Sequence, residues 1–79
     1  MGQRPRQKPE RLGAKLLAIR QRLKLAQPEI AKSLSISAKR ISEFESGRRE
    51  PNLLVILRYA RTANVSVESL IDDEIELKF

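Results

Sequence analysis

The chain of 79 residues contains no cysteine and no histidine, and aromatic residues make up only 4% of it. Without cysteine it cannot form a disulfide or a thiolate metal site. Without histidine it lacks the commonest general base and the commonest metal ligand. No nucleophile and base stand at a recognisable spacing, so we expect no enzymatic activity, no bound metal and no cofactor. With so few rings, stacking of single-stranded nucleic acid on aromatic side chains is also disfavoured.

Long apolar runs are absent as well. No run approaches the roughly 20 residues that a membrane-spanning helix needs. No apolar segment follows the basic residues at the N-terminus, as it would in a secretory signal. We therefore expect no association with a membrane, and a protein that stays in the compartment where it is made.

What the chain does have is positive charge, and this charge is unevenly placed. The formal net charge is +6, with a balance of +2 over residues 1–10, +6 over residues 11–50 and −2 over residues 51–79. A positive region of this kind is the electrostatic footprint of a polyanion binder. The alternative is that the excess of Lys and Arg only keeps a small protein soluble, and the segregation along the chain favours the polyanion binder over it.

Apolar spacing predicts an all-α domain over residues 10–72. Leu12, Leu16, Ile19 and Leu23 recur at intervals of three and four residues, which gives one apolar helix face. The expected helices span residues 10–23, 27–34, 38–45, 53–63 and 67–72. A flexible basic arm at residues 1–9 is expected before them, and a tail at residues 73–79 after them.

Residues that favour helix ends support these boundaries. Ser37, Asn52 and Ser66 precede three of the expected helices, where their side-chain oxygens can accept an unpaired backbone N–H. Gly47 and Asn64 follow two of them, where a left-handed residue commonly ends a helix. The chain therefore marks the limits of its helices as well as their apolar faces.

The second and third expected helices form the most informative pair. They are short, and only Ser35 to Ser37 separate them. Ala31 is a small residue at the point where the two helix axes would cross. Two short helices at a steep angle that share one small core are typical of a helix-turn-helix, with the second helix facing outward. In a basic chain, the natural target of that helix is the major groove of DNA.

An ordered set of residues across this region extends the argument. It comprises Gln27, Glu29-Ile30-Ala31, Leu34, Ser37, Ile41-Ser42, Glu45-Ser46-Gly47-Arg48-Arg49, Pro51, Val65-Ser66 and Leu70. With this set the chain, from about Leu12 to Ile71, resembles the five-helix DNA-binding domains of phage repressors and Cro proteins, the Xre-like family of bacterial regulators. The resemblance implies a compact repressor-like domain in the bacterial cytoplasm, associated with the nucleoid.

The resemblance also implies roles for individual residues. The residues expected to reach base edges are Ala38, Lys39, Arg40 and Glu43. Those expected to contact phosphates are Gln27, Ser37, Ser46, Gly47, Arg48 and Arg49. Arg20 and Glu45 occupy the positions of an ion pair that locks the first helix onto the third.

The chemistry of these side chains fits the implied roles to different degrees. Lys39 and Arg40 match the paired O6 and N7 acceptors of guanine, and Ala38 offers a methyl group to the methyl of thymine. Under the alternative, Lys39 and Arg40 are solvated charges on an exposed helix and Ala38 is a filler. Glu43 can accept from the amino group of cytosine, or it can pair with Lys39 one helical turn earlier.

Two positions depart from the family pattern. Ser35 stands where the turn usually has glycine, which costs of order 1 kcal/mol if the backbone is left-handed there. Ala26 replaces the usual Ser or Thr cap of the second helix, a loss of roughly 1 kcal/mol and of one phosphate contact.

The fourth expected helix and the tail carry more apolar residues than one domain needs. Leu53, Ile56, Leu57 and Ala60 are expected to face inward, which leaves Leu54 and Val55 without a partner. The tail alternates polar and apolar residues, with the period of a strand. Either the tail folds back over the fourth helix, or both surfaces meet a second subunit. The residues expected in such a dimer or partner surface are Leu54, Val55, Ile75, Leu77 and Phe79.

The acidic residues of the tail raise the question of a cation site. Asp72, Asp73, Glu74 and Glu76 lack the alternating ligands and the turn glycine of a calcium loop. We therefore expect a solvated acidic tail that keeps this end of the domain away from DNA.

Together these features predict a DNA-binding transcriptional regulator, by default a repressor, that binds a pseudo-palindromic operator in double-stranded DNA as a homodimer. One alternative is an antitoxin, which would use the same DNA face and hold a toxin partner on the tail or the fourth helix. Another is a protein-interaction module that has kept the fold and lost DNA binding.

Overall fold

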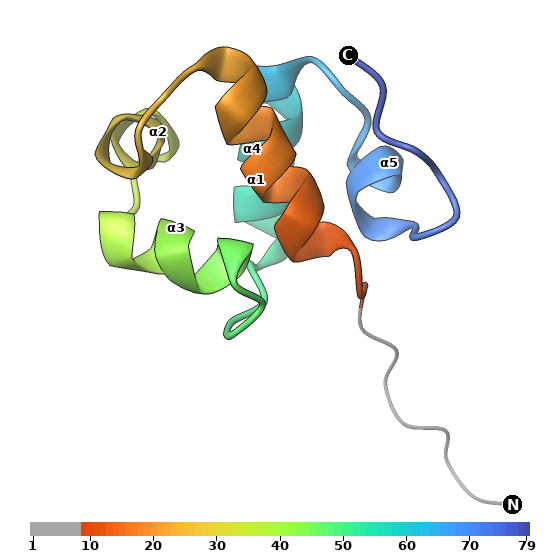
Figure 1. The fold of residues 1–79 in the computed structure, drawn as a ribbon, viewed down its shortest axis with the longest axis horizontal. Coiled ribbons are helices and arrows are strands. Elements are labelled where there is room, and N and C mark those ends of the chain that lie inside the picture. The colour runs from red at the N-terminus through yellow and green to blue at the C-terminus, as the bar shows by residue number, and fades with distance from the viewer. Residues whose placement is uncertain (1–8) are drawn as a thin grey trace, which may run out of the picture.

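The computed structural model describes residues 9–79, and within them the chain forms five α-helices and no strand (Figure 1). The helices are α1 (Leu12–Leu23), α2 (Gln27–Leu34), α3 (Ala38–Glu45), α4 (Leu53–Ala63) and α5 (Val67–Ile71). This confirms the all-α class. Helix α1 begins two residues later than expected and α5 ends one residue earlier. Residues 1–8 of the expected basic arm lie outside the described residues.

The helices enclose one apolar core. Its fully buried side chains are Leu16, Ile19, Ile30, Leu34, Ile41, Tyr59 and Leu70, so every helix contributes at least one. A domain of this size has a small core, so each of these contacts is a large share of its stability. Among the described residues, no helix combines the length and the apolar character needed to cross a bilayer.

Capping residues fix the helix ends largely as the sequence predicts. The side chains of Ser37, Asn52 and Ser66 accept backbone N–H groups of α3, α4 and α5. Ala26 has no side chain that can cap α2, but Glu29 Oε1 accepts the Ala26 N–H at 2.8 Å. Half of a capping box therefore replaces the missing hydroxyl.

Three helices end on a left-handed residue that is not glycine. These residues are Lys24, Ser35 and Asn64, with φ of 57°, 58° and 58°. Ser35 therefore adopts the strained conformation that the usual glycine would relieve. At this position the N–H of Ile36 reaches back to the carbonyl of Ala31 at 3.0 Å, which closes the end of α2.

The tail, residues 73–79, packs along α1 (Figure 1). The sequence predicted instead that the tail is a strand, and that it either covers α4 or contacts a second subunit. The Asp73 carboxylate accepts the backbone N–H groups of Glu10 and Arg11 at 2.8 and 2.9 Å. Arg11 Nη2 pairs with Glu76 at 2.9 Å. These contacts hold the pKa of Asp73 and Glu76 below their ordinary values, because hydrogen bonds and the Arg11 charge stabilise the carboxylates. The acidic tail is exposed at Glu74 and Glu76, as expected, but contacts of Asp73 and Glu76 that the sequence did not indicate tie it to the start of α1.

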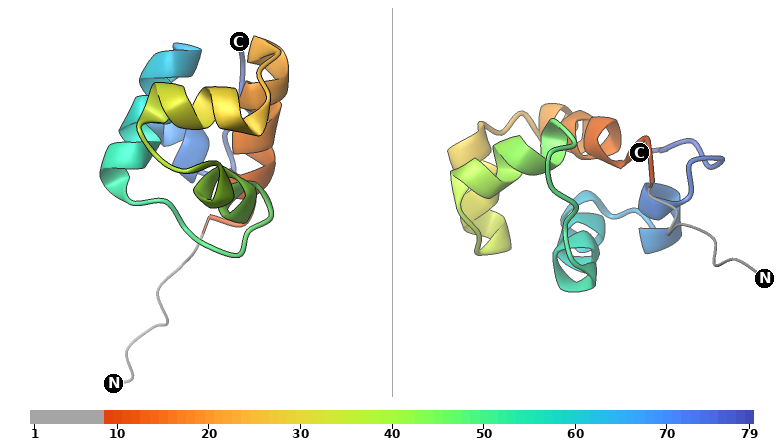
Figure 2. Two further views of the ribbon diagram at one scale, coloured as in Figure 1. Left: turned by 90° about the vertical axis from the view of Figure 1, so that its left-hand side faces the viewer. Right: turned by 90° about the horizontal axis from the view of Figure 1, so that it is seen from below.

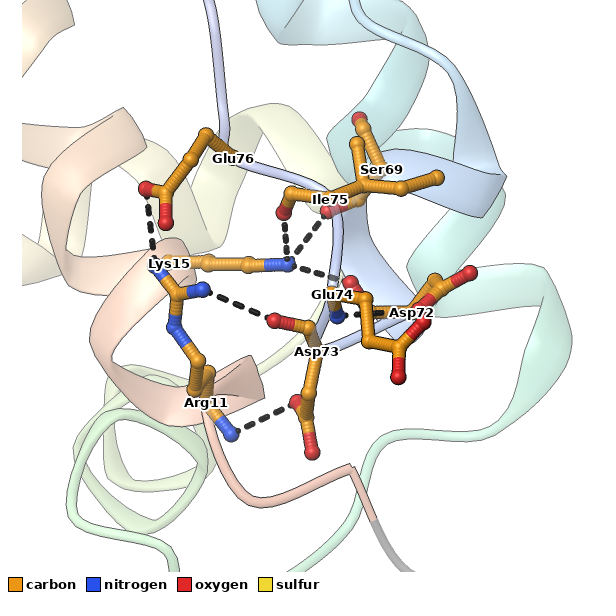
Figure 3. A network of polar contacts seen from close by, with 8 residues as sticks. All are labelled: Arg11, Lys15, Ser69, Asp72, Asp73, Glu74, Ile75 and Glu76. Atoms are coloured by element: carbon orange, nitrogen blue, oxygen red, sulfur yellow. Dashed lines mark hydrogen bonds and ion pairs between the residues drawn. The ribbon is translucent and has the colours of Figure 1, made fainter.

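Besides Arg11, Lys15 also binds the tail (Figure 3). The sequence pattern did not indicate this role. Its side chain lies in the interior, with only 4% of the residue exposed. Its ammonium group donates to the carbonyls of Ser69, Asp72 and Ile75 at 2.7 to 2.8 Å. All three donors of the ammonium are satisfied, as a buried lysine requires.

The inward face of α4 differs from the prediction at two positions. Leu53 is 77% exposed, and Val55, expected on the surface, is 6% exposed and belongs to the core. Ile56 and Ala60 are buried as predicted, and Tyr59 joins them. Leu54 is exposed as predicted. The unpartnered apolar pair is therefore Leu53 and Leu54, because Val55 points inward.

Gly13 permits the close approach of α1 to the end of α3. A Cβ atom built at Gly13 would lie 2.9 Å from the carbonyl oxygens of both Phe44 and Glu45. Those atoms belong to the backbone, so they cannot move aside as a flexible side chain can. The absence of a side chain at this position therefore sets the distance between the two helices.

We predict that Ser35→Gly stabilises the domain by about 1 kcal/mol, because glycine adopts the left-handed conformation without a Cβ penalty. Chemical denaturation measures the effect. Ser33→Gly, inside α2, is the matched control and should destabilise, since glycine is a poor helix residue. Equal effects of the two substitutions would contradict the assignment of strain to Ser35.

We predict that Gly13→Ala destabilises the domain by at least about 1 kcal/mol, as overpacking does. Helix propensity alone would predict a gain of about 1 kcal/mol for the same change, so the sign of the effect separates the two causes. Gln21→Ala, on the exposed face of α1, is the control without a clash. A more stable Gly13→Ala variant would show that the two helices are not in close contact.

Candidate nucleic-acid interface

Helices α2 and α3 form a helix-turn-helix supported from behind by α1. Ile30, Ala31 and Leu34 of α2 pack with Ile41 and Phe44 of α3 in the core. The other face of α3 is left outside. Figures 1 and 2 place α2 and α3 at one end of the molecule, with α5 and the acidic tail at the other. The charge segregation seen in the sequence is therefore also a separation in space.

The first turn of α3 presents the candidate base-reading residues. Lys39 and Arg40 are exposed, and neither side chain has a hydrogen bond or ion pair within residues 9–79. Ala38 is half-buried and packs against the core, so it has a filling role as well. The structure thus brings two unpaired cations side by side at the free end of a rigid helix.

Glu43 lies further along α3, and its ion-pair partner in the structure is not Lys39. Its carboxylate lies 3.4 Å from Arg49 Nε, so the pairing with Lys39 is not the one formed. Its side chain is only 22% exposed. The acidic residue on this helix is therefore tied to the loop that follows it.

The candidate phosphate-contacting residues lie in two groups. Ser46, Gly47, Arg48 and Arg49 follow α3 in an exposed loop, in which Gly47 has φ +80°. Ser37 and Gln27 lie at the starts of α3 and α2, and the Ser37 hydroxyl already accepts the Arg40 N–H at 3.3 Å. The loop thus offers two guanidinium groups, and Ser37 serves first as a cap.

The Glu45 carboxylate connects three helices at the base of this surface. Arg20 donates from Nε and Nη2 at 2.7 and 3.0 Å, and Gln27 Nε2 donates at 3.1 Å. The hydrogen bonds to Glu45 raise the pKa of Arg20 above its ordinary value. Arg20 also donates to the Leu25 carbonyl at 3.0 Å. The structure therefore brings Arg20 and Glu45 together and adds Gln27 to them.

Sequence reasoning missed Arg58 as a further support of this surface. Its Nη1 donates to the carbonyl of Leu34, the last residue of α2, at 3.0 Å. A cation at the C-terminal end of a helix is favourable because the last carbonyls are unpaired. The signal in the sequence is weak, since 24 residues separate Arg58 from its acceptor.

Comparison with known families identifies the fold. The helix-turn-helix family model matches residues 16–70, which is more than half of the chain. No curated protein shows significant sequence similarity to this chain.

Solved structures agree with the family match. The P22 c2 repressor, solved in complex with a synthetic operator, has a TM-score of 0.74 and 27% identity, over 78% of this chain and 94% of that chain. The regulator ClgR from C. glutamicum has a TM-score of 0.69 and 26% identity, over 84% and 86% of the two chains. The DNA-binding domain of SinR from Bacillus subtilis has a TM-score of 0.74 at 19% identity, over 84% and 97%, which is a likeness of fold. The chain therefore belongs to the helix-turn-helix family of the Xre and Cro type and has the fold of its DNA-binding transcriptional regulators.

Proposed function

We propose that the chain is a sequence-specific repressor that binds a pseudo-palindromic operator in double-stranded DNA as a homodimer. The observation that carries the proposal is the pair of exposed, unpaired cations, Lys39 and Arg40, on the first turn of α3. The operator complex of the P22 c2 repressor, a protein of similar fold, supports it. Such a regulator acts at the nucleoid in the bacterial cytoplasm by excluding other proteins from its operator.

Within this proposal, two sets of residues have different tasks. Lys39 and Arg40 read guanine through its O6 and N7 acceptors, and Ala38 offers a methyl to thymine. Arg48 and Arg49 contact phosphates, together with the exposed N–H groups of the loop at Ser46 and Gly47. Phosphate contacts position the protein on the duplex without reading its sequence. Gln27 and Ser37 complete the phosphate contacts at the starts of α2 and α3.

We place the dimer contact at Leu53 and Leu54. The exposed fractions are 77% and 54%, and both residues lie at the start of α4, which residues 50–52 separate from the phosphate loop, defined as residues 46–49. The tail residues are less suited, because Leu77 packs against the core and Phe79 lies beneath Arg22, 5.4 Å from the guanidinium carbon to the ring centre. A two-fold contact beside the DNA surface sets the spacing of the two α3 helices, about 34 Å for half-sites one turn apart.

This contact is too small to hold a dimer in free solution. Full burial of two leucines from each protomer removes roughly 250–500 Å² of apolar surface. Specific stable interfaces bury about 1,200–2,000 Å². We therefore expect a monomer when free and a dimer on the operator, where DNA holds the two protomers at high effective concentration.

Lys39→Ala and Arg40→Ala should each relax discrimination at particular base pairs, by about 1–3 kcal/mol per lost contact. Arg48→Ala should weaken binding to all duplexes alike and lower the slope of log K against log salt by about 1. An operator is first selected from a random DNA pool, and affinities for it and for its single-base variants are then measured.

Two outcomes would contradict the assignment. Uniform losses across all sequences for Lys39→Ala and Arg40→Ala would show that these residues contact only phosphate. No binding of any duplex at low salt by the folded protein would favour the protein-interaction module instead.

Replacing both leucines, Leu53→Ser with Leu54→Ser, should leave affinity for a half-site unchanged and lower affinity for the full operator about tenfold or more. The Hill coefficient should fall from about 2 toward 1. Ile71→Ser, at an exposed apolar residue on α5, is the matched control. Binding curves on one and two half-sites measure the effect, and sedimentation shows the free oligomeric state. Unchanged cooperativity would show that Leu53 and Leu54 do not form the dimer contact. This surface would then be available to another protein, as the antitoxin alternative requires.

A further inference from the structure

The α3 helix and the phosphate loop meet at one acidic residue, Glu43. Its main-chain carbonyl accepts the N–H groups of Arg48 and Arg49 at 2.9 and 3.3 Å, and the Ser46 hydroxyl at 3.2 Å. Its carboxylate lies 3.4 Å from Arg49 Nε. Glu43 is therefore the residue around which the loop folds back onto α3.

The ion pair places a carboxylate in competition with DNA. Arg49 is half-exposed, so its guanidinium is accessible to a phosphate. A guanidinium binds carboxylates and phosphates through the same paired N–H groups. A phosphate that takes Arg49 must displace Glu43 and leave its carboxylate uncompensated close to the negative backbone. Arg48 has no such partner within residues 9–79.

Operator DNA can compensate for this loss where other DNA cannot. A carboxylate released from Arg49 requires a hydrogen-bond donor, and in the major groove the amino group of cytosine is the donor that pairs with Glu. A duplex with cytosine at the right position can take both residues at once, Glu43 on the base and Arg49 on a phosphate. Guanine and thymine present no amino group in the major groove, and adenine presents its amino group beside the N7 acceptor, which repels a carboxylate, so a duplex with another base there compensates Glu43 less well.

We propose that Glu43 is a specificity-determining residue that withholds Arg49 from non-operator DNA and releases it where the groove presents a cytosine amino group. The inference rests on the proposed DNA-binding function and deepens it. Glu43 then acts mainly by lowering the affinity for wrong sequences. Specificity is a difference between two affinities, so weakening the wrong complex is as effective as strengthening the right one.

The test compares Glu43→Gln with wild type on the selected operator and on a scrambled duplex, over a range of salt concentrations. Glu43→Gln should tighten binding to the scrambled duplex by about two- to fivefold, the range that an exposed ion pair provides. The salt slope on that duplex should steepen by about 1, because Arg49 then contacts a phosphate. Preference for cytosine at one operator position should disappear.

Three further variants isolate the mechanism. Glu74→Gln removes the same charge on the tail, at the opposite end of the molecule, and should leave the salt slope unchanged (Figure 1). Arg49→Ala should abolish the gain when combined with Glu43→Gln, which a double-mutant cycle measures. Glu43→Ala should also tighten binding to the scrambled duplex. It controls for the possibility that the Gln side chain of Glu43→Gln still binds Arg49.

Each outcome decides a separate question. If Glu43→Gln tightens scrambled DNA no more than Glu74→Gln does, or keeps its gain in the Arg49→Ala background, the inference is overturned while the DNA-binding function stands. If wild type binds no duplex at low salt, the proposed function fails first. Unfolding midpoints of all variants confirm that the compared proteins are folded.

Discussion

The carboxylate of Glu45 is the contact on which the arrangement of the first three helices depends. It accepts two hydrogen bonds from Arg20 and one from Gln27, so α1, α2 and α3 meet at one group. The pair is largely buried, and loss of one partner from a buried pair costs about 3–5 kcal/mol. Tyr59 lies close by, and its burial, followed by the charge of Glu45, raises the pKa of its phenol. The orientation of α3 is thus fixed by hydrogen bonds within the domain.

The contacts of α1 extend this support across the molecule. One side of α1 approaches the backbone of α3 at Gly13, and the other carries the tail through Arg11 and Lys15 (Figure 3). Asp73 caps the N-terminal end of α1 from 62 residues away along the chain. Two carboxylates of the tail, Asp73 and Glu76, are therefore held by groups just before α1. At the α3 end, Lys39, Arg40 and Arg48 have no such partner within residues 9–79.

The sequence predicted most of the helices because local rules decide them. Apolar spacing and the caps Ser37 and Asn52 define α3 and α4 without reference to the rest of the fold. The sequence did not predict correctly which face of α4 is buried. Residues 53–57 are all apolar, and such a run has no periodicity to show which side faces the core. Tertiary packing makes that choice, and it buries Val55 rather than Leu53.

The same limit explains which parts of the site could be predicted. Lys39 and Arg40 follow from position, because the first turn after the Ser37 cap faces outward in a helix-turn-helix. The partner of Glu43 could not be predicted from the sequence, because a helical spacing of four favours Lys39. Only the fold of the loop brings Arg49 close to Glu43. Lys15 lies on the buried side of α1, where a lysine is unexpected unless distant carbonyls surround it.

A division among the basic residues connects these observations to DNA binding. Arg11, Lys15, Arg20 and Arg58 donate to groups within the domain. These cations already have partners, so the number of basic residues overstates the number that can release counterions from DNA. Lys39, Arg40 and Arg48 have no partner within residues 9–79, so a phosphate or base can reach them without breaking an internal contact. Arg49 belongs to neither class, because it is exposed and also paired with Glu43, and this is why we propose Glu43 as the residue that distinguishes one duplex from another.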